Sequence, residues 1–399
     1  MISVAAAKEI INTSTVALPA TECLLQLAAG KILAEDVYAS TDIPAFPQSS
    51  MDGYAFLYSQ WEQNKKLILE GEIAAGSKEK KLVAAGKAVR IFTGAPVPAG
   101  ADTVVMQEKV IIDSSVNDIK KLLIEDERIQ QGTNVRPKGS EIKSGELALE
   151  KGSLLSPAGI GFLAGIGIAT VKVFPNPAVS IIITGNELQQ HGKPLEYGGV
   201  YESNSFTLAA ALQHLHVDTV KIYNANDDLK IVTDILEKAL QQSDLVLLTG
   251  GISAGDYDFV LQAAENCGVT KLFHKIKQRP GKPLYFGKKG NKLVFGLPGN
   301  PSSVLTCFYE YVLAALEILT ARKVSLQSIK APLLKPFRKS AALTHFLKGF
   351  YNGSTVTVLD AQESYRLSSF AKANCLVKIN EEVMDCKEGE IMEVHLLPF

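Results

Sequence analysis

Patterns typical of buried strands alternate with helical patterns in the central part of the chain. Short runs that are apolar on both faces predict four strands, at Val179–Thr184, Thr219–Tyr223, Leu245–Thr249 and Leu293–Phe295. Apolar residues at helical spacing predict four helices, at Ser205–Leu215, Asp228–Gln241, Phe259–Glu265 and Ser303–Thr320. Strands that alternate with helices of this length form a mostly parallel sheet covered on both faces. The pattern therefore predicts an open α/β domain.

The flanking segments show other patterns. Helical spacing predicts helices at Ser3–Ile11 and Thr21–Leu33, and the small apolar residues of Ser156–Thr170 suit a tightly packed helix. From Pro44 to Gly100, prolines and glycines interrupt short β-prone runs, which predicts an irregular β domain. Its β-prone runs are Ala88–Phe92, Thr103–Gln107 and, more weakly, 110–129. The short β runs after Ala321, at Ser354–Leu359, Cys375–Ile379 and Ile391–Leu397, predict a small C-terminal β-barrel.

Composition and charge narrow the class of protein. The chain has 399 residues, 46% of them hydrophobic and 21% charged, which is typical of a globular protein of two to four domains. A net charge of -1 gives no support for nucleic-acid binding. No uninterrupted apolar run reaches the roughly 20 residues that span a bilayer, and the N-terminus does not resemble a signal peptide. The five scattered cysteines form no CxxC pair. We therefore expect a cytoplasmic protein that binds neither membranes nor nucleic acid.

Two predicted strands lead directly into glycine-rich turns. The stretch Asp244–Asp258 reads DLVLLTGGISAGDYD, and Lys275–Pro301 ends in GLPGNP before a long helical pattern. Glycine frees the backbone to approach a ligand closely, and N–H groups at helix starts bind anions. Three cations, Lys275, Arg279 and Lys282, lie nearby in the sequence. The pattern predicts a phosphate-bearing ligand at the carboxyl edge of the sheet.

Carboxylates are predicted at the same edge. Glu187 follows the first predicted strand within Thr184-Gly185-Asn186-Glu187, and Asp227, Asp228, Asp256 and Asp258 follow the next two. Converging carboxylates without a Cys/His set suit Mg²⁺ better than a softer metal. The alternative is helix capping, by the residues after Thr184 and by Asp227 or Asp228. The six histidines show no metal-ligand spacing and are interpreted as structural or surface residues.

Three loops of the predicted β domain carry polar groups with two possible interpretations. Ser49–Ala55 contains the turn dipeptide Asp52-Gly53, and Thr93 begins a second turn. Asn134–Glu141 gathers Arg136, Lys138 and Glu141. Each loop is explained either as an ordinary surface turn or as a ligand frame, in which arginine supplies paired donors to an oxyanion.

These pieces, in this order, are similar to the molybdopterin molybdenumtransferase family, which includes the E domain of gephyrin. The resemblance covers nearly the whole chain. The motifs that carry it are FPQSSMDGYAF, RIFTGAPVPAGADTVV, NVRPKGSEI, ITGNEL, DLVLLTGGISAGDYD, RPGKP, GLPGNPSS and FAKANCL. Each is weak alone, and the ordered set is specific.

The resemblance implies a multidomain α/β plus β fold and an elongated homodimer. The implied parts are an N-terminal helical linker domain at 1–40 with 141–174, an inserted β domain at 41–140, a central doubly wound α/β molybdopterin-binding domain at 175–322 and a C-terminal β-barrel domain at 323–399. The discontinuous first domain comes from the resemblance alone, because periodicity does not indicate it.

The resemblance also implies an activity: insertion of molybdenum from molybdate into adenylylated molybdopterin, with release of AMP. The implied pterin nucleotide contacts are Thr249, Gly250, Gly251, Ser253, Lys282, Pro298, Gly299, Asn300 and Pro301. Glu187, Asp227 and Asp258 would hold Mg²⁺ and position the pyrophosphate link. Molybdate contacts would come from Lys275, Arg279, Arg136, Lys348 and Ser368. Asp52, Thr93, Arg136 and Glu141 would come from the β domain of the partner subunit.

Two alternatives remain at this point. A molybdopterin adenylyltransferase shares the central domain and would act on unmodified molybdopterin with ATP. A non-catalytic scaffold of the gephyrin type would keep the fold without the chemistry. The β insertion and C-terminal domain argue against the first, and the carboxylate and lysine set argues against the second. The implied protein partners are the adenylyltransferase and the apo-forms of molybdoenzymes, because the intermediates are labile.

Overall fold

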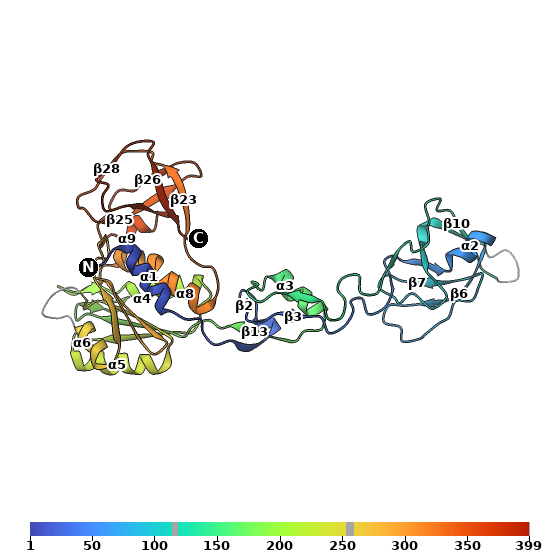
Figure 1. Cartoon of the computed structure of the whole chain (residues 1–399), viewed down its shortest axis with the longest axis horizontal. Helices are drawn as coiled ribbons and strands as arrows, with labels where there is room; N and C mark the ends of the chain where they lie inside the picture. The colour runs from blue at the N-terminus through green and yellow to red at the C-terminus, as the bar shows by residue number, and fades with distance from the viewer. Residues whose placement is uncertain (114–118, 253–258, 399) are drawn as a thin grey trace. The chain divides into compact units, whose positions relative to one another are not determined.

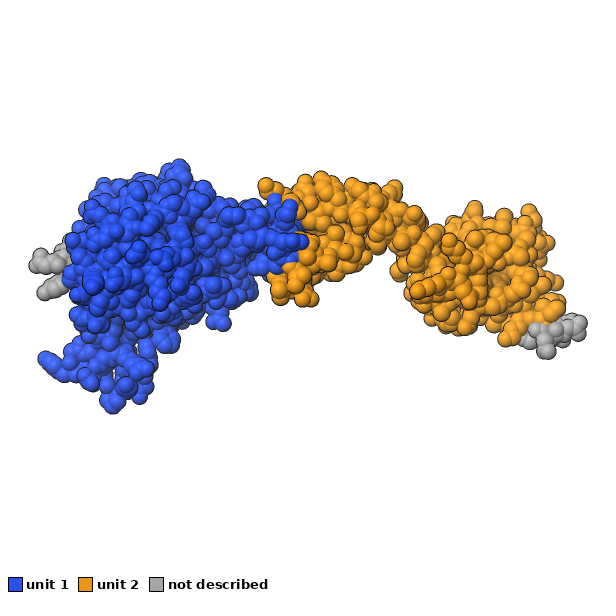
Figure 2. Space-filling view, turned by 90° about the horizontal axis from the view of Figure 1, so that it is seen from below, with its two compact units in different colours: residues 1–23, 28–34, 172–399 blue, residues 24–27, 35–171 orange. Residues whose placement is uncertain are grey.

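The computed structural model describes residues 1–113, 119–252 and 259–398. Their contacts divide the chain into two compact units (Figure 2). Unit 1 comprises residues 1–23, 28–34 and 172–399, and unit 2 comprises residues 24–27 and 35–171. The four-part division expected from the resemblance stays a prediction, and each unit is described by itself.

A six-stranded sheet lies at the centre of unit 1. Its strand order is β17 (Val220–Ala225), β14 (Val179–Thr184), β18 (Leu245–Thr249), β22 (Lys292–Leu297), β21 (Tyr285–Lys289), β19 (Thr270–His274). The first four are parallel, as predicted. The last two are antiparallel strands, with β19 at the edge of the sheet, and the sequence pattern did not predict them. A short parallel pair, β15 (Leu188–Gln189) and β16 (Val200–Tyr201), lies outside this sheet.

Helices cover both faces of the sheet (Figure 1). One face packs against α5 (Leu229–Gln242) and α6 (Phe259–Asn266). The other packs against α1 (Val4–Ser14), α4 (Asn204–His214) and a long helix. The long helix consists of α7 (Pro301–Cys307), a π-helical turn (Phe308–Val312) and α8 (Leu313–Thr320). By length and composition it is apolar enough to cross a membrane, but it is mostly buried inside the protein, as core helices are.

Alternate residues of each central strand enter different hydrophobic cores, as period-2 side-chain direction requires. Ile181 and Leu247 join the core shared with α1, α4 and the long helix. Ile182 and Val246 join the core shared with α5 and α6. Both sets are fully buried. This explains why the strands are apolar on both faces in the sequence.

A second sheet of unit 1 forms the C-terminal β domain. Its order is β20 (Gln278–Arg279), β25 (Thr344–Tyr351), β27 (Cys375–Ile379), β29 (Ile391–Leu396), β23 (Gln327–Pro332), with β26 (Val356–Val358) paired to β25. A separate pair joins β24 (Phe337–Arg338) to β28 (Asp385–Cys386), and α9 (Leu367–Phe370) is a single short turn. Because β20 belongs to the RPGKP loop, this sheet reaches a segment that carries predicted site residues.

Unit 2 contains a six-stranded sheet with a core on each face. Its order is β8 (Thr103–Met106), β5 (Gly53–Phe56), β7 (Lys87–Ile91), β6 (Leu67–Ile73), β10 (Lys121–Ile124), β9 (Val110–Asp113). On one face, Phe56 of β5 packs with Trp61 of α2 (Tyr58–Asn64). On the other face, Ala55 packs with Ile91. The remaining short elements are β3 (Val37–Tyr38), β4 (Gln48–Ser49), η2 (Gln107–Lys109), β11 (Val135–Arg136), β12 (Leu147–Leu149) and α3 (Pro157–Gly165).

The predicted helix at Thr21–Leu33 is wrong. The segment forms β1 (Thr21–Leu24), a 3-10 turn (Leu25–Leu27) and β2 (Ile32–Leu33). β2 pairs with β13 (Thr170–Phe174), more than 130 residues away in the sequence. This long-range pairing overrides local helical spacing. The helix predicted at Ser3–Ile11 is confirmed as α1, and its Val4, Ala7 and Ile11 are buried in the core of unit 1.

Candidate active site

The two glycine-rich turns lie side by side at the carboxyl edge of the central sheet. They follow neighbouring parallel strands, in which Thr249 and Leu297 are register partners. A Cβ placed on Gly299 would lie 3.8 Å from Cα of Gly250. Gly250 has φ +88°, and a Cβ there would lie 2.6 Å from the carbonyl oxygen of Thr184, so only glycine fits. The geometry brings two sets of backbone groups to one place.

The second turn is held from two directions. Asn204, the first residue of α4, donates from Nδ2 to the Gly299 carbonyl at 2.8 Å. Asn300 donates from Nδ2 to Ser364 Oγ at 3.0 Å, and the Ser302 amide donates to the Ser364 carbonyl at 3.1 Å. Asn300 and Pro301 therefore sit where a helix start meets a loop of the C-terminal domain.

Three buried polar atoms around these turns have no hydrogen-bond partner in the described part of the chain. They are Thr249 Oγ1, Asn204 Oδ1 and Ser302 Oγ. Such an atom costs roughly 1–3 kcal/mol when it is left unpaired. Their position beside both turns is consistent with a site that gains polar partners from a bound ligand.

Two hydrogen bonds join the carboxylate-bearing loops that follow β14 and β17. The Asn186 amide donates to Asp227 Oδ2 at 3.3 Å, and the Asp227 amide donates to Asn186 Oδ1 at 3.1 Å. Glu187 is exposed, with its carboxylate folded against Gly185. Asp228 caps α5 by accepting from the Ile231 amide at 2.9 Å, so the capping interpretation is correct for this residue.

The carboxylates at the strand ends are chemically suited to a hard divalent cation. Glu187 and Asp227 offer carboxylate oxygens from neighbouring strand ends, which suit Mg²⁺. No group of three or more His, Cys, Asp or Glu residues that could hold a metal occurs within residues 1–113, 119–252 and 259–398. The third predicted ligand, Asp258, and the predicted phosphate contact Ser253 both lie outside the described residues.

The predicted cations lie on a loop that closes on itself. Lys275 has φ +70°, and its amide donates to the Leu284 carbonyl at 3.0 Å. The Ile276 amide donates to the Lys282 carbonyl at 2.9 Å. Arg279 and Lys282 are exposed, and Arg279 donates to Ser340 Oγ at 2.6 Å. The Arg279 guanidinium and the Lys282 ammonium groups are thus exposed on one short loop.

Lys348 is placed differently from the other predicted anion contacts. It is buried, and Nζ donates to the carbonyls of Ala361, Glu363 and Arg366 at 2.8, 3.3 and 3.1 Å. Burial lowers the pKa of Lys348 to about 8. Ser368 is exposed, whereas its neighbour Ser369 is buried and donates to the Ala361 carbonyl at 2.8 Å. Lys348 therefore holds the 361–366 loop, and its role as a molybdate contact stays a prediction.

In unit 2, the predicted loop residues converge. Asp52 Oδ1 accepts from the Thr93 amide at 2.8 Å and from Thr93 Oγ1 at 2.7 Å. These two hydrogen bonds hold the pKa of Asp52 below its usual range, with a smaller contribution from the charge of Arg90. Both residues are exposed, so the carboxylate is fixed and accessible.

The third loop of unit 2 joins the first through strand pairing. β11 pairs with β4, which sets Arg136 opposite Gln48. The Gly94 amide donates to the Ser49 carbonyl at 2.8 Å, which connects the second loop to the same strand. Glu141 is exposed, and its amide donates to the Ile43 carbonyl at 2.9 Å. The structure thus brings Asp52, Thr93 and the backbone at Arg136 together.

The sequence did not indicate several residues whose side chains support the loops of the site. Asn204, Gln278 and Ser364 belong to no motif, and each has a partner distant in the sequence: the Gly299 carbonyl, Tyr311 and Asn300 respectively. The only signal in the sequence is the placement of Gln278 directly before RPGKP.

The fold and these turns define a class: a multidomain protein built around a molybdopterin-binding type of α/β domain. Residues 2–167 match the family described as MoeA N-terminal region (domain I and II). Residues 180–318 match the "Probable molybdopterin binding domain", and residues 330–397 match the MoeA C-terminal region (domain IV).

Known proteins are similar to this chain over nearly its whole length. A molybdopterin molybdenumtransferase of Haemophilus influenzae is 34% identical over 387 residues, which cover 94% of this chain and 94% of that protein. One from Staphylococcus aureus is 34% identical and covers 98% of this chain and 94% of its own length. A molybdopterin biosynthesis MoeA protein from Pyrococcus horikoshii superposes with a TM-score of 0.84 at 30% identity and covers 99% of both chains. The chain belongs to the molybdopterin molybdenumtransferase family.

Proposed function

We propose that this chain inserts molybdenum from molybdate into adenylylated molybdopterin and releases AMP. The observation that carries the proposal is the meeting of the Gly250 and Gly299 turns at one sheet edge, beside unpaired buried polar atoms. Family membership over the full length supports the activity. The presence of the flanking domains argues against an adenylyltransferase that consists of the central domain alone.

The proposed chemistry is a ligand exchange followed by cleavage of a phosphoanhydride. The two dithiolene sulfurs of the pterin displace two oxygens of molybdate, which take up protons and leave as water. A water molecule then hydrolyses the bond between the two phosphates, which gives AMP and the pterin phosphate. Lys275, Arg279 and Lys282 supply positive charge close to the anionic groups. Backbone N–H groups at Gly250, Gly251 and Gly299, with Pro298 shaping the turn, cradle the phosphates.

Mg²⁺ is proposed as the resident cation. Glu187 and Asp227 would hold it, with Asp258 as the third carboxylate, and bound Mg²⁺ stabilises the negative charge that develops on the leaving phosphate. The reciprocal hydrogen bonds between Asn186 and Asp227 keep the two described carboxylate loops in register without the metal.

The proposed assembly is a homodimer in the cytoplasm. Asp52, Thr93, Arg136 and Glu141 of the partner subunit would complete each site, as the family resemblance implies. Transfer of labile intermediates favours contact with the adenylyltransferase that supplies the substrate and with the apo-enzymes that receive the product.

Release of AMP from purified protein tests the function. The protein is given adenylylated molybdopterin, Mg²⁺ and molybdate, and AMP is quantified with and without molybdate. Glu187→Ala is expected to lower the rate of AMP release at least about 100-fold, because the variant loses a carboxylate that would hold Mg²⁺ against the leaving phosphate. Glu196→Ala is the matched control, because Glu196 is an exposed glutamate of the following loop with no proposed role.

The alternatives give different results in the same assay. An adenylyltransferase would instead release pyrophosphate from ATP in the presence of unmodified molybdopterin. A scaffold would bind the pterin nucleotide and release no AMP under any condition, and that outcome would refute the proposal.

A further inference from the structure

A buried amide lies directly under the cationic loop. Gln278 is 0% exposed and immediately precedes the RPGKP segment that carries Arg279 and Lys282. Its Nε2 donates to the carbonyls of Pro280 and Gly281 at 3.0 and 3.2 Å. Both N–H groups of the Gln278 side chain therefore donate to the backbone of this loop. In the proposed function, the side chains of the same loop face the substrate.

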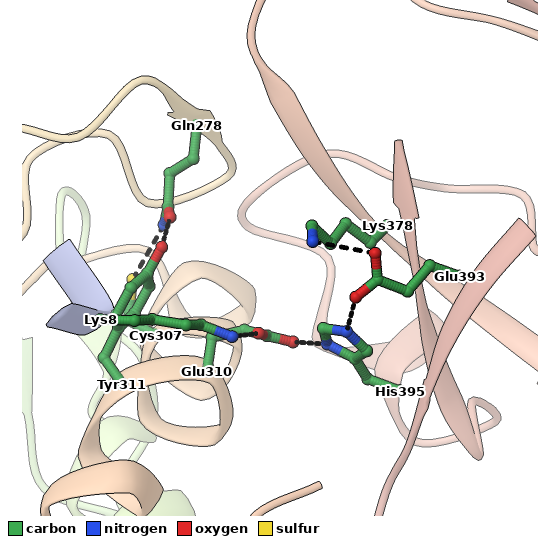
Figure 3. Close-up of polar contacts among 8 residues, drawn as sticks. All are labelled: Lys8, Gln278, Cys307, Glu310, Tyr311, Lys378, Glu393 and His395. Carbon is green, nitrogen blue, oxygen red and sulfur yellow. Dashed lines mark hydrogen bonds and ion pairs between the residues drawn. The ribbon is translucent and has the colours of Figure 1, made fainter. Parts of the chain in front are cut away.

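The other end of the amide is held by Tyr311. The Tyr311 hydroxyl contacts Gln278 Oε1 (Figure 3). Carbonyl oxygens only accept, so the amino group of Gln278 must face Pro280 and Gly281, and Tyr311 must donate. Tyr311 is fully buried, and burial raises the pKa of its hydroxyl, which keeps the proton in place for donation.

The loop also fits tightly against this support. Gly281 has φ +83°, and a Cβ there would lie 2.4 Å from Cys307 Sγ and 3.0 Å from Gln278 Nε2. The absence of a side chain lets the backbone settle on the buried thiol and amide. Cys307 is itself 0% exposed and lies 3.6 Å from Gln278 Nε2.

Tyr311 is in turn fixed by the π-helical turn. Consecutive residues Glu310 and Tyr311 face different partners: Glu310 contacts Lys8 and His395, and Tyr311 contacts Gln278 (Figure 3). A π-helical turn adds a residue to the helix and changes the side-chain directions, and such turns are frequent at functional sites. The support under the loop is thus anchored in the core of unit 1.

We propose that Gln278 and Tyr311 are positioning residues that hold the backbone of residues 279–283 so that Arg279 and Lys282 present their charges to the anionic substrates. This inference rests on the proposed function. Neither residue touches substrate; they act through the loop. An oxyanion site works when its donors are fixed before the ligand arrives, so loosening the loop weakens anion binding.

Four variants test the proposal. Gln278→Met keeps the approximate volume and removes every polar contact, and Tyr311→Phe removes only the hydroxyl. The double variant Gln278→Met/Tyr311→Phe removes both partners of one buried hydrogen bond, which restores the part of the stability lost in Gln278→Met that comes from the unpaired Tyr311 hydroxyl. Asn374→Leu is the matched control, because the Asn374 amide also holds backbone, at Tyr351, at 2.7 and 2.8 Å, in the C-terminal domain.

Four quantities are measured: the thermal midpoint, the KM and the kcat for AMP release at varied molybdate, and hydrogen exchange in 279–283, where Arg279, Gly281 and Lys282 carry amide hydrogens. Gln278→Met is expected to raise the KM for molybdate about tenfold with kcat changed less, as loss of uniform binding does. Exchange in 279–283 is expected to rise in the same variant. Tyr311→Phe, which keeps the donors to the loop, is expected to have a smaller effect on KM.

The double variant separates positioning from stability. Positioning predicts that its thermal midpoint recovers toward wild type while the KM stays raised and the loop amides stay fast. A return of KM together with the midpoint, or the same KM change in Asn374→Leu, would overturn the proposal.

Hydrogen exchange keeps the inference separate from the activity. Absence of AMP release from the wild-type protein would refute the proposed function. Unchanged exchange in 279–283 of Gln278→Met would refute the positioning role, whatever the activity.

Discussion

At the scale of single residues, Asp52 shows how a turn signal becomes a candidate functional group. The Asp52-Gly53 pair predicted a turn, and in the structure the chain bends over residues 50–52 while Gly53 begins β5. It also gives the carboxylate two donors from Thr93, 41 residues later in the chain. An ordinary surface turn does not require its aspartate to be fixed by a second loop.

Thr93→Val tests this contact. The variant keeps the backbone donor and the side-chain shape and loses the hydroxyl donor. Because that hydrogen bond lowers the pKa of Asp52, the pKa is expected to rise toward its ordinary value, as NMR titration of the Asp52 carboxyl would show. A several-fold lower kcat/KM for AMP release is expected near neutral pH.

Thr133→Val is the control for this variant, since Thr133 Oγ accepts from the Gln130 amide in the same unit and away from Asp52. An unchanged Asp52 pKa in Thr93→Val would show that the carboxylate is held by the backbone amide alone.

At the same scale, residue types were predictable and their contacts were not. The sequence identified Glu187, Asp227, Lys275 and Arg279 from their positions after predicted strands or in charged loops. The family resemblance also implied Lys348 as a molybdate contact, and in the structure its side chain donates to three backbone carbonyls. A lysine and its charge are visible in a sequence, whereas the acceptors that surround it come from folding.

At the scale of elements, a chain of charged groups joins three parts of unit 1. Glu310 of the π-helical turn accepts from Lys8 of α1 at 2.7 Å and contacts His395 Nδ1 of β29 at 2.7 Å. His395 Nε2 contacts Glu393 at 3.0 Å, and Lys378 of β27 pairs with Glu393 at 2.9 Å. This network links the N-terminal helix, the core helix and the C-terminal sheet (Figure 3).

Opposing effects set the protonation of this network. Burial lowers the pKa of His395, but the hydrogen bonds and charges of Glu310 and Glu393 outweigh it and raise the pKa above its ordinary value of 6.5. Burial raises the pKa of Glu310, but the hydrogen bonds and charges of His395 and Lys8 lower it below its ordinary value of 4.5. Each member of the buried pair therefore favours the charged form of the other.

His395→Gln tests the sign of this linkage. A raised histidine pKa adds stability that is complete below the unfolded pKa and is lost as pH rises through the folded pKa. The stability difference between wild type and variant is thus expected to be greatest near about pH 6, at roughly 3 kcal/mol, and to shrink as the pH rises through the raised pKa of His395. It is also expected to shrink in acid, as Glu310 takes up a proton.

Thermal unfolding of both proteins across this pH range provides the measurement. His345 is a useful internal reference, because burial lowers its pKa to about 4 and its effect is the same in both proteins. A difference that does not depend on pH would show that His395 acts through packing alone.

Element positions were predicted well where pattern and tertiary structure agree. The central strand Val179–Thr184 has the predicted bounds, and so does Leu245–Thr249. The antiparallel strands β19 and β21 were missed because their apolar runs are short and contain lysines. Thr21–Leu33 was wrong because its partner strand lies far along the chain.

At the scale of the whole molecule, the predicted site residues belong to both compact units. Asp52 and Thr93 belong to unit 2, and Glu187 and Asp227 belong to unit 1. In the proposed homodimer, the two sets that act on one substrate come from different subunits. This arrangement makes a prediction about mixtures of inactive proteins.

Asp52→Asn and Glu187→Ala proteins are expected to be inactive separately and to regain activity when unfolded and refolded together. Random pairing makes about half of the dimers mixed, and each mixed dimer has one intact site, so about a quarter of wild-type activity is expected. The rate of AMP release measures it.

The matched control mixes Glu187→Ala with Asp227→Ala. Both changes lie in unit 1, so every site in every dimer carries one of them and no activity is expected. Failure of the first mixture to regain activity would show that each site is built within one chain.

The sequence by itself determined the parallel sheet, the glycine-rich turns that follow its strands and the carboxylates Glu187 and Asp227 at its strand ends. These follow from local causes: apolar periodicity, glycine at turns and carboxylates at strand ends. The tertiary structure alone decided that the Gly250 and Gly299 turns are adjacent, that Thr93 fixes Asp52 and that Gln278 and Tyr311 lie under the cationic loop. Such contacts join groups that are distant along the chain, and only the folded backbone sets their distances and hydrogen-bond partners.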